Sequence, residues 1–158
     1  MATRREIRWG LLENIADRET VAFAKHTDLT AFNYVGGEGE GPPEVMVIGQ
    51  NPGAQEDIRK RPFVGASGII QRMLMQRSGL RTKHVHVEKD ATYPANCWLT
   101  NVIKFRTPGN RQPTEEEIEL ARPYLRQEWE AIGQPSIVVC VGAVARRAVY
   151  GNVGPRAS

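Results

Sequence analysis

The chain has 158 residues, 41% of them hydrophobic and 25% charged, and a net charge of +3. This composition excludes a disordered segment, and the length fits a single domain over residues 1–158. No apolar run approaches the roughly 20 residues that cross a bilayer. The start of the chain also lacks the apolar segment of a signal peptide, so we expect a cytoplasmic protein without membrane contact. The slight positive charge is compatible with nucleic-acid binding but does not establish it.

The N-terminal region, residues 1–35, is predicted to be helical. Between residues 4 and 26, apolar side chains recur at helical spacing among charged ones. They are Ile7, Leu11, Leu12 and Ile15. Residues 35–43 are rich in Gly and Pro, a composition typical of turns. We predict that they form a connector leading to an α/β core at 44–151.

Three short apolar runs are typical of strands that are covered on both faces. They are Val45–Ile48, Cys97–Ile103 and Ser136–Val141. Helices are predicted between and after them, at 67–76, after the capping box of Thr114 and Glu117, and from Gly142 onward. This alternation predicts an α/β fold, a three-layer α/β/α sandwich with a short, mainly parallel sheet. His84 and His86 alternate with valines, as in a strand.

Polar residues follow two of these strands, at the ends where a parallel sheet binds its ligands. The run Gly49-Gln50-Asn51-Pro52-Gly53 ends the first strand, and Phe63 lies further along the same loop. Asn101 stands within the second apolar run. Taken alone, Asn-Pro-Gly is typical of a simple turn and Phe63 of core packing. A buried amide such as Asn101 needs partners, so a binding role and a structural role are equally expected for it.

In this order, the motifs resemble those of the uracil-DNA glycosylase superfamily, and most closely its family 4. That family shows a Gly-Glu-Ala-Pro-Gly turn, then Pro-Phe-Val-Gly, then Thr-Asn-Val-Val-Lys, then Pro-Gly-Asn-Arg before a helix. The similar stretch runs from about Val45 to Gly151. The resemblance implies a monofunctional enzyme of base excision repair. It would flip uracil out of DNA, hydrolyse the N-glycosidic bond and leave an abasic site, with uracil-containing DNA as its partner.

The resemblance also implies roles for individual residues. Phe63 would stack on the flipped uracil, and Asn101 would hydrogen-bond the polar edge of the base. Gly49 and Glu56 would complete the substrate-binding set, with Glu56 placed to crowd out the methyl group of thymine. Family 4 has Ala where this chain has Asn51, whereas the mismatch-specific and single-strand-selective groups have Asn. Asn51 would orient the attacking water, and backbone N–H groups near Gln50 would stabilise the departing uracil anion.

Basic residues in the loops after the strands suit contacts with DNA phosphates, although each also suits an ordinary solvated charge. They are Lys104, Arg106, Arg111, Arg146 and Arg147.

Family 4 enzymes carry an iron–sulfur cluster on four cysteines, and this chain departs from that pattern. It lacks the N-terminal Cys-x-x-Cys, and Phe105 and Ala121 align with the other two ligands. Cys97 and Cys140 stand at neither place. We therefore predict no cluster, no other cofactor and no metal site, and we expect Phe105 to fill the space with apolar contact.

The sequence also lacks the His-Pro-Ser motif that follows a fourth strand in the superfamily. His26, His84 and His86 all precede the third strand. Three explanations stay open: a truncated chain, a protein partner that completes the C-terminal side of the fold, or lost activity. The alternative hypotheses are a catalytically impaired DNA-binding or interaction module in a replication or repair assembly, and a small-molecule or nucleotide enzyme built on the same sheet.

Overall fold

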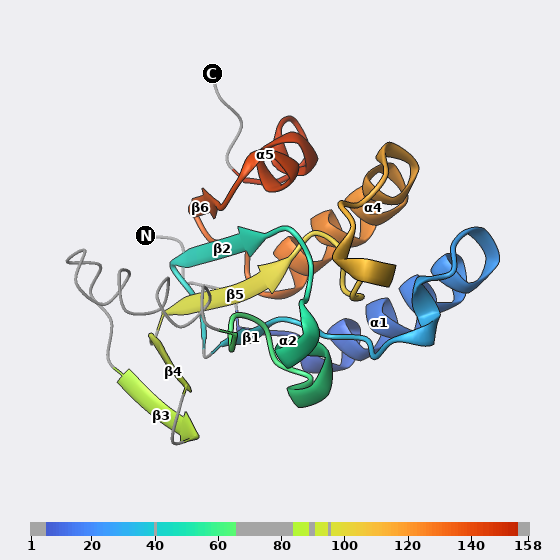
Figure 1. Ribbon diagram of the computed structural model, residues 1–158. Coiled ribbons are helices and arrows are strands. Elements are labelled where there is room, and N and C mark those ends of the chain that lie inside the picture. Colours follow the sequence, from blue (N-terminus) through green and yellow to red (C-terminus); the bar gives the residue numbers. More distant parts are fainter. Residues whose placement is uncertain (1–5, 40, 66–83, 89–90, 95, 155–158) are drawn as a thin grey trace.

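A computed structural model describes residues 6–39, 41–65, 84–88, 91–94 and 96–154 (Figure 1). Its main sheet has four strands in the order β1-β5-β2-β6. They are β1 (Glu38–Gly39), β5 (Cys97–Asn101), β2 (Val45–Gly49) and β6 (Ile137–Cys140). Strand β2 runs parallel to β5 and to β6, while β1 is antiparallel to β5. The predicted α/β fold with a mainly parallel sheet is therefore confirmed.

Strands β2 and β5 form the buried centre of the sheet. Every residue in both strands is buried, as expected for strands covered on both faces. Val45 pairs with Cys97 at one end of the ladder, and Gly49 pairs with Asn101 at the other. Two strands that the sequence separates widely therefore end side by side, and polar residues follow both ends.

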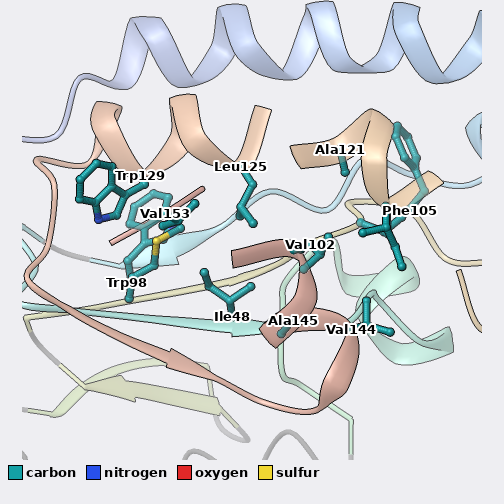
Figure 2. Close-up of a cluster of buried hydrophobic side chains, with 14 of the residues drawn as sticks. Ile48, Trp98, Val102, Phe105, Ala121, Leu125, Trp129, Val144, Ala145 and Val153 are labelled. Carbon is teal, nitrogen blue, oxygen red and sulfur yellow. The ribbon is translucent and has the colours of Figure 1, made fainter. Parts of the chain in front are cut away.

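Helices α1 (Trp9–His26), α4 (Glu115–Ala131) and α5 (Ala143–Val149) flank this sheet and share its main hydrophobic core. Helix α2 (Ala54–Arg59) has no buried residue, and short 3-10 turns lie at Leu29–Ala31 and Pro108–Asn110. In the core, Ile48 and Trp98 of the strands pack with Leu125 of α4 and Ala145 of α5 (Figure 2). Phe23 of α1 belongs to the same cluster, so the N-terminal helix is part of this core.

A smaller apolar cluster lies on the opposite face of the central strands. It contains Val45, Val47, Cys97 and Leu99, with Phe63 and Val141 packed against it. Successive side chains of a strand point to opposite faces, so Val45 and Val47 belong here while Met46 and Ile48 belong to the main core. Phe63 is thus anchored by apolar contact beside the ends of β2 and β5.

Helix α4 begins with the capping box that the sequence predicts. The Glu117 backbone N–H donates to Thr114 Oγ1 at 3.1 Å, and the Thr114 N–H donates to Glu117 Oε1 at 2.8 Å. Arg111 adds two hydrogen bonds to the same carboxylate, at 2.8 and 2.9 Å. Although burial opposes it, these bonds hold the pKa of Glu117 below its ordinary value.

Thr114→Ala is expected to lower the free energy of unfolding by about 1 kcal/mol, because the N–H of Glu117 loses its acceptor. Chemical denaturation measures the change. Thr114→Ser is the matched control, since it keeps the capping hydroxyl and should stay close to the wild type. Equal losses in both variants would show that the methyl group, and not the cap, stabilises this helix start.

Some elements differ from the sequence prediction. The connector expected at 35–43 contains β1, and an added Cβ at Gly39 would lie 2.2 Å from the Cys97 carbonyl oxygen. Only glycine allows this close backbone approach, which composition does not reveal.

Helix α2 was not predicted, and the helix expected at 67–76 lies outside the described residues. The strand at His84 and His86 is confirmed as β3 (His84–Glu88), which pairs with β4 (Ala91–Pro94) in a separate two-stranded sheet.

Strand β6 lies at the edge of the main sheet and is partly open to solvent. Ile137 is 47% exposed and Val139 is 38% exposed, whereas Val138 and Cys140 pack against the main core. The expectation of a strand covered on both faces is therefore wrong for β6 within the described residues. In the same part of the chain, no helix is both long and apolar enough to cross a membrane.

Candidate active site

The carboxyl ends of β2 and β5 place Gly49 directly beside Asn101. The parallel pairing continues past the strands, because the Val102 N–H donates to the Gly49 carbonyl at 2.9 Å and the Ile103 N–H donates to the Gln50 carbonyl at 3.0 Å. The backbone of both loops is therefore fixed where the polar side chains begin. This ladder accounts for the position of Asn101 without any contact made by its carboxamide.

Gly49 is the point on which two side chains converge. A Cβ added at this position would lie 2.6 Å from Asn101 Oδ1 and 2.9 Å from Phe63 Cζ. The aromatic ring and the amide therefore both approach the same stretch of bare backbone. Asn101 is only 4% exposed, and among the described residues its carboxamide has no hydrogen-bond partner. A buried amide next to an aromatic ring is suited to hold a flat, polar ligand.

Phe63 takes an unusual backbone conformation, with a φ of +55°. Non-glycine residues seldom adopt this left-handed region, so neighbouring contacts must hold it. One of these contacts is the bidentate ion pair between Glu38 and Arg61, which lies two residues before Phe63. Arg61 Nε lies 2.9 Å from Glu38 Oε2, and Arg61 Nη2 lies 3.0 Å from Glu38 Oε1. This pair ties the Phe63 segment to β1.

Glu56 holds the Phe63 segment from the other side. Its carboxylate accepts hydrogen bonds from the backbone N–H groups of Gly53 and Val64, each at 3.0 Å, and from that of Gly65. The first bond closes the N-terminus of α2, and the other two lie immediately after Phe63. Glu56 therefore fixes the geometry of the candidate pocket. Its expected role in excluding thymine stays a prediction.

Glu56→Ala is expected to loosen residues 59–65, because three backbone donors lose a charged acceptor. Limited trypsin digestion measures this, since the bonds after Arg59 and Lys60 adjoin the segment. We expect cleavage there to be about tenfold faster than in the wild type, for a local loss of about 1.4 kcal/mol. Gln55→Ala, on the exposed side of α2, is the control. Equal rates in both variants would reject the anchoring role.

Asn51 lies between the two loops. Its Nδ2 lies 3.4 Å from Thr107 Oγ1 and 3.3 Å from the Pro52 carbonyl, and its Oδ1 accepts from Gln50 Nε2 at 3.2 Å. These contacts orient the carboxamide and leave one lone pair of Oδ1 for a water molecule. Sequence reasoning missed Thr107, which is fully buried and follows β5 at some distance. No local signal marks a threonine as the partner of an amide from another loop.

Comparison with known proteins identifies the family of the chain. Residues 37–157 match the sequence profile described as the uracil DNA glycosylase superfamily. The chain belongs to that superfamily.

Relatives within the uracil DNA glycosylase superfamily include two named "Type-4 uracil-DNA glycosylase". The protein from Archaeoglobus fulgidus is 37% identical over 121 residues, which is 77% of this chain and 54% of the relative. The protein from Thermotoga maritima is 34% identical over 145 residues, 92% of this chain and 67% of the relative. A "Type-5 uracil-DNA glycosylase" of Pyrobaculum aerophilum is 35% identical over 115 residues. The chain spans only a little over half the length of several such relatives.

The structure corrects the predicted DNA contact of Lys104 in this superfamily member. Lys104 is 3% exposed, its Nζ lies 2.9 Å from Glu128 Oε1, and it donates to the backbone carbonyl of Asn101. A buried and paired ammonium group does not reach a phosphate in solvent. Sequence reasoning failed here because the partner, Glu128, lies on a different element and leaves no local signal.

The other basic residues stay nearer to the surface. Arg111 binds the Glu117 carboxylate in a bidentate pair, which raises the pKa of Arg111 and engages part of its charge. Arg147 pairs with Glu115. Arg106 donates to Asn110 Oδ1 at 3.1 Å, and its guanidinium lies 5.5 Å from the centre of the Phe32 ring. Arg146 is exposed in the last turn of α5. Phosphate contacts by Arg106, Arg111 and Arg146 stay predictions.

The two positions that align with cysteine ligands of family 4 lie in the apolar core. The Phe105 ring lies 5.5 Å from the rings of both Phe23 and Tyr34, and Ala121 is fully buried (Figure 2). The expected apolar contact of Phe105 is confirmed. Within the described ranges, no three His, Cys, Asp or Glu side chains are grouped as metal ligands. Burial raises the pKa of the Cys97 thiol to about 11.

Proposed function

We propose that this chain recognises uracil flipped out of DNA and hydrolyses its N-glycosidic bond, leaving an abasic site. The observation that carries the proposal is the convergence of Phe63 and Asn101 on Gly49. Relatives named as uracil-DNA glycosylases and the superfamily match of residues 37–157 support it. Because the chain spans only part of the length of those relatives, similarity alone does not establish their activity for it.

The chemistry of the pocket favours uracil over cytosine. Uracil presents O4 as an acceptor beside N3–H as a donor, and a single carboxamide such as that of Asn101 complements both. Cytosine presents a donor and an acceptor in the reverse order. Leaving buried polar groups unpaired costs about 1–3 kcal/mol for each group. The bare backbone at Gly49 would let the base lie close to the strand end, with the Phe63 ring as its stacking surface.

Asn51 is the residue proposed to hold the attacking water. An amide does not remove a proton at neutral pH, but its Oδ1 can accept a hydrogen bond from water and direct it to the anomeric carbon. This suffices where the glycosidic bond breaks largely before water adds. Backbone N–H groups near Gln50 and Asn51 would then stabilise the uracil anion as it leaves.

A second candidate function is DNA binding without catalysis. It is favoured by the positions of the three histidines of the chain, none of which lies in the loop directly after β2, β5 or β6. His26 ends α1, and His84 and His86 lie on β3 of the separate sheet. On this alternative, salt-sensitive binding through residues such as Arg106 would occur without release of a base.

The test uses single- and double-stranded oligonucleotides with one uracil, incubated with excess protein and then treated with alkali to cut abasic sites. We expect cleavage at the uracil, and a loss of about 100-fold or more in Asn51→Ala and Asn101→Ala. Asn14→Ala, on α1, is the control. Binding without cleavage would favour the second candidate, and wild-type rates in both site variants would reject the proposed site.

A further inference from the structure

A cavity of about 200 Å³ is lined by residues outside the candidate active site. It is enclosed by α1, the segment 34–37, β5 and α4, and neither Gly49, Asn51 nor Phe63 lines it. Nothing in the proposed uracil chemistry uses this cavity. Its volume suits a single small head group and is below that of sites for drug-sized ligands.

Three aromatic side chains contribute to the walls of this cavity. Trp9, Tyr34 and Trp98 line it, and the rings of Trp9 and Trp98 lie 5.7 Å apart between centres, at an angle of 52°. Trp9 is 55% exposed, so this ring stands at the opening and not in the core. The faces of tryptophan rings attract cations, and more strongly where water is excluded.

The charged groups of the lining are mostly acidic. Glu13, Glu19 and Glu128 line the cavity, against a single cation, Lys104. Glu19 and Glu128 are almost completely buried, at 1% and 3% exposure. Lys104 divides its ammonium between Glu128 and the Asn101 carbonyl. One cation therefore faces two buried carboxylates.

Both buried carboxylates retain capacity for a further partner. Glu128 Oε2 accepts from Trp98 Nε1 at 2.9 Å, but Glu128 Oε1 has no directed hydrogen bond within the described structure, although Lys104 Nζ lies 2.9 Å away. Glu19 accepts from the Tyr34 hydroxyl at 3.1 Å. Burial raises the pKa of Glu19 to about 7, although the charge of Lys104 opposes this shift. A nearby cation favours the charged form of such a buried carboxyl group.

We propose that this cavity binds a small organic cation of the alkylguanidinium or alkylammonium class. The cation lies against the Trp9 and Trp98 rings, and Glu19 and Glu128 neutralise its charge. Anions are excluded by the carboxylates, and a neutral ligand of the same shape gains neither the ion pairs nor the attraction of the rings. The assignment does not depend on uracil release.

Isothermal titration calorimetry of the 158-residue chain tests the proposal. The probes are ethylguanidinium chloride, tetramethylammonium chloride and the peptide acetyl-Gly-Arg-Gly-amide, each at constant ionic strength. Ethylurea is the neutral control of similar shape. We expect saturable, millimolar binding of the cations and none of ethylurea. Binding of the peptide as well as the free cations would identify an arginine side chain as a ligand, and binding of the free cations alone would identify a small molecule.

Variants locate the binding. Trp9→Ala and Glu19→Gln are each expected to weaken it by about tenfold or more. Trp9 is exposed and Gln keeps the shape of Glu, so both proteins should fold, which circular dichroism checks. Glu119→Gln, on the exposed side of α4, should bind like the wild type. The proposal is overturned if no cation binds at millimolar concentrations, if ethylurea binds equally, or if both variants bind unchanged.

Discussion

Gly49→Ala is expected to reduce the single-turnover rate of the proposed uracil release by about 100-fold or more, because it displaces the groups proposed to hold the base. The added methyl carbon would lie 2.6 Å from Asn101 Oδ1 and 2.9 Å from Phe63 Cζ. Real Cβ contacts are longer, so the amide, the ring or both must move. Phe63 has little freedom to do so, because the anchors at Arg61 and Glu56 fix its segment on both sides.

The measurement compares uracil release and DNA binding in the same protein. Affinity for an oligonucleotide without uracil should stay within about twofold of the wild type, since the proposed phosphate contacts do not involve Gly49. Calorimetric titration with free uracil gives the same comparison without turnover. Gly10→Ala on α1, where a Cβ meets nothing within 4 Å, is the matched control. Unchanged release in Gly49→Ala would place the base elsewhere and reject the pocket.

The stability of the protein is expected to fall as the pH rises from about 5 to about 8, because of Glu19. Burial raises the pKa of this carboxyl from 4.5 to about 7. Between these values the folded state binds a proton that the unfolded state releases. The contribution of this bound proton to the free energy of unfolding is fully present below pH 4.5 and is lost as the pH rises through about 7. For one group with this shift, the loss of unfolding free energy is about 3 kcal/mol.

Glu19→Gln should remove this dependence, since the amide resembles the protonated acid at every pH. Urea denaturation at several pH values between 5 and 8 measures how the free energy of unfolding changes with pH in each protein. Glu119→Gln, an exposed carboxylate, should keep the wild-type slope. The lowered pKa of Glu117 acts in a different window, because its contribution disappears only as the pH falls below the ordinary range of a carboxyl group. Parallel slopes for Glu19→Gln and the wild type would contradict the prediction.

Features that depend on local pattern could be predicted from the sequence. The short apolar runs at the start of β2 and β5 predict strands, because uninterrupted apolar residues are typical of a strand with both faces covered. The start of α4 follows from Thr114 and Glu117, which satisfy each other across one turn. Asn101 stood out because an amide within an apolar strand requires a partner.

Features that depend on distant partners could not be predicted in this way. The sequence suggests that Lys104 is a surface charge. Its ion-pair partner, Glu128, lies on α4, and only the fold brings the two side chains together. The sequence suggests that Glu19 belongs to the charged face of a helix, but it is buried and accepts a hydrogen bond from the Tyr34 hydroxyl. Glu56 resembles a pocket residue in the family pattern, and its three backbone donors are visible only after the chain has folded back.

The order of the strands has a consequence for how the chain folds during synthesis. Strand β2 emerges from the ribosome early, but Val45 pairs with Cys97 on one side and Ile137 on the other, both much later in the chain. A fully apolar strand must therefore wait without neighbours, since translation proceeds at only about 5–20 residues per second. Pairing between such distant segments is intrinsically slow. During this interval β2 is open to aggregation and to capture by chaperones.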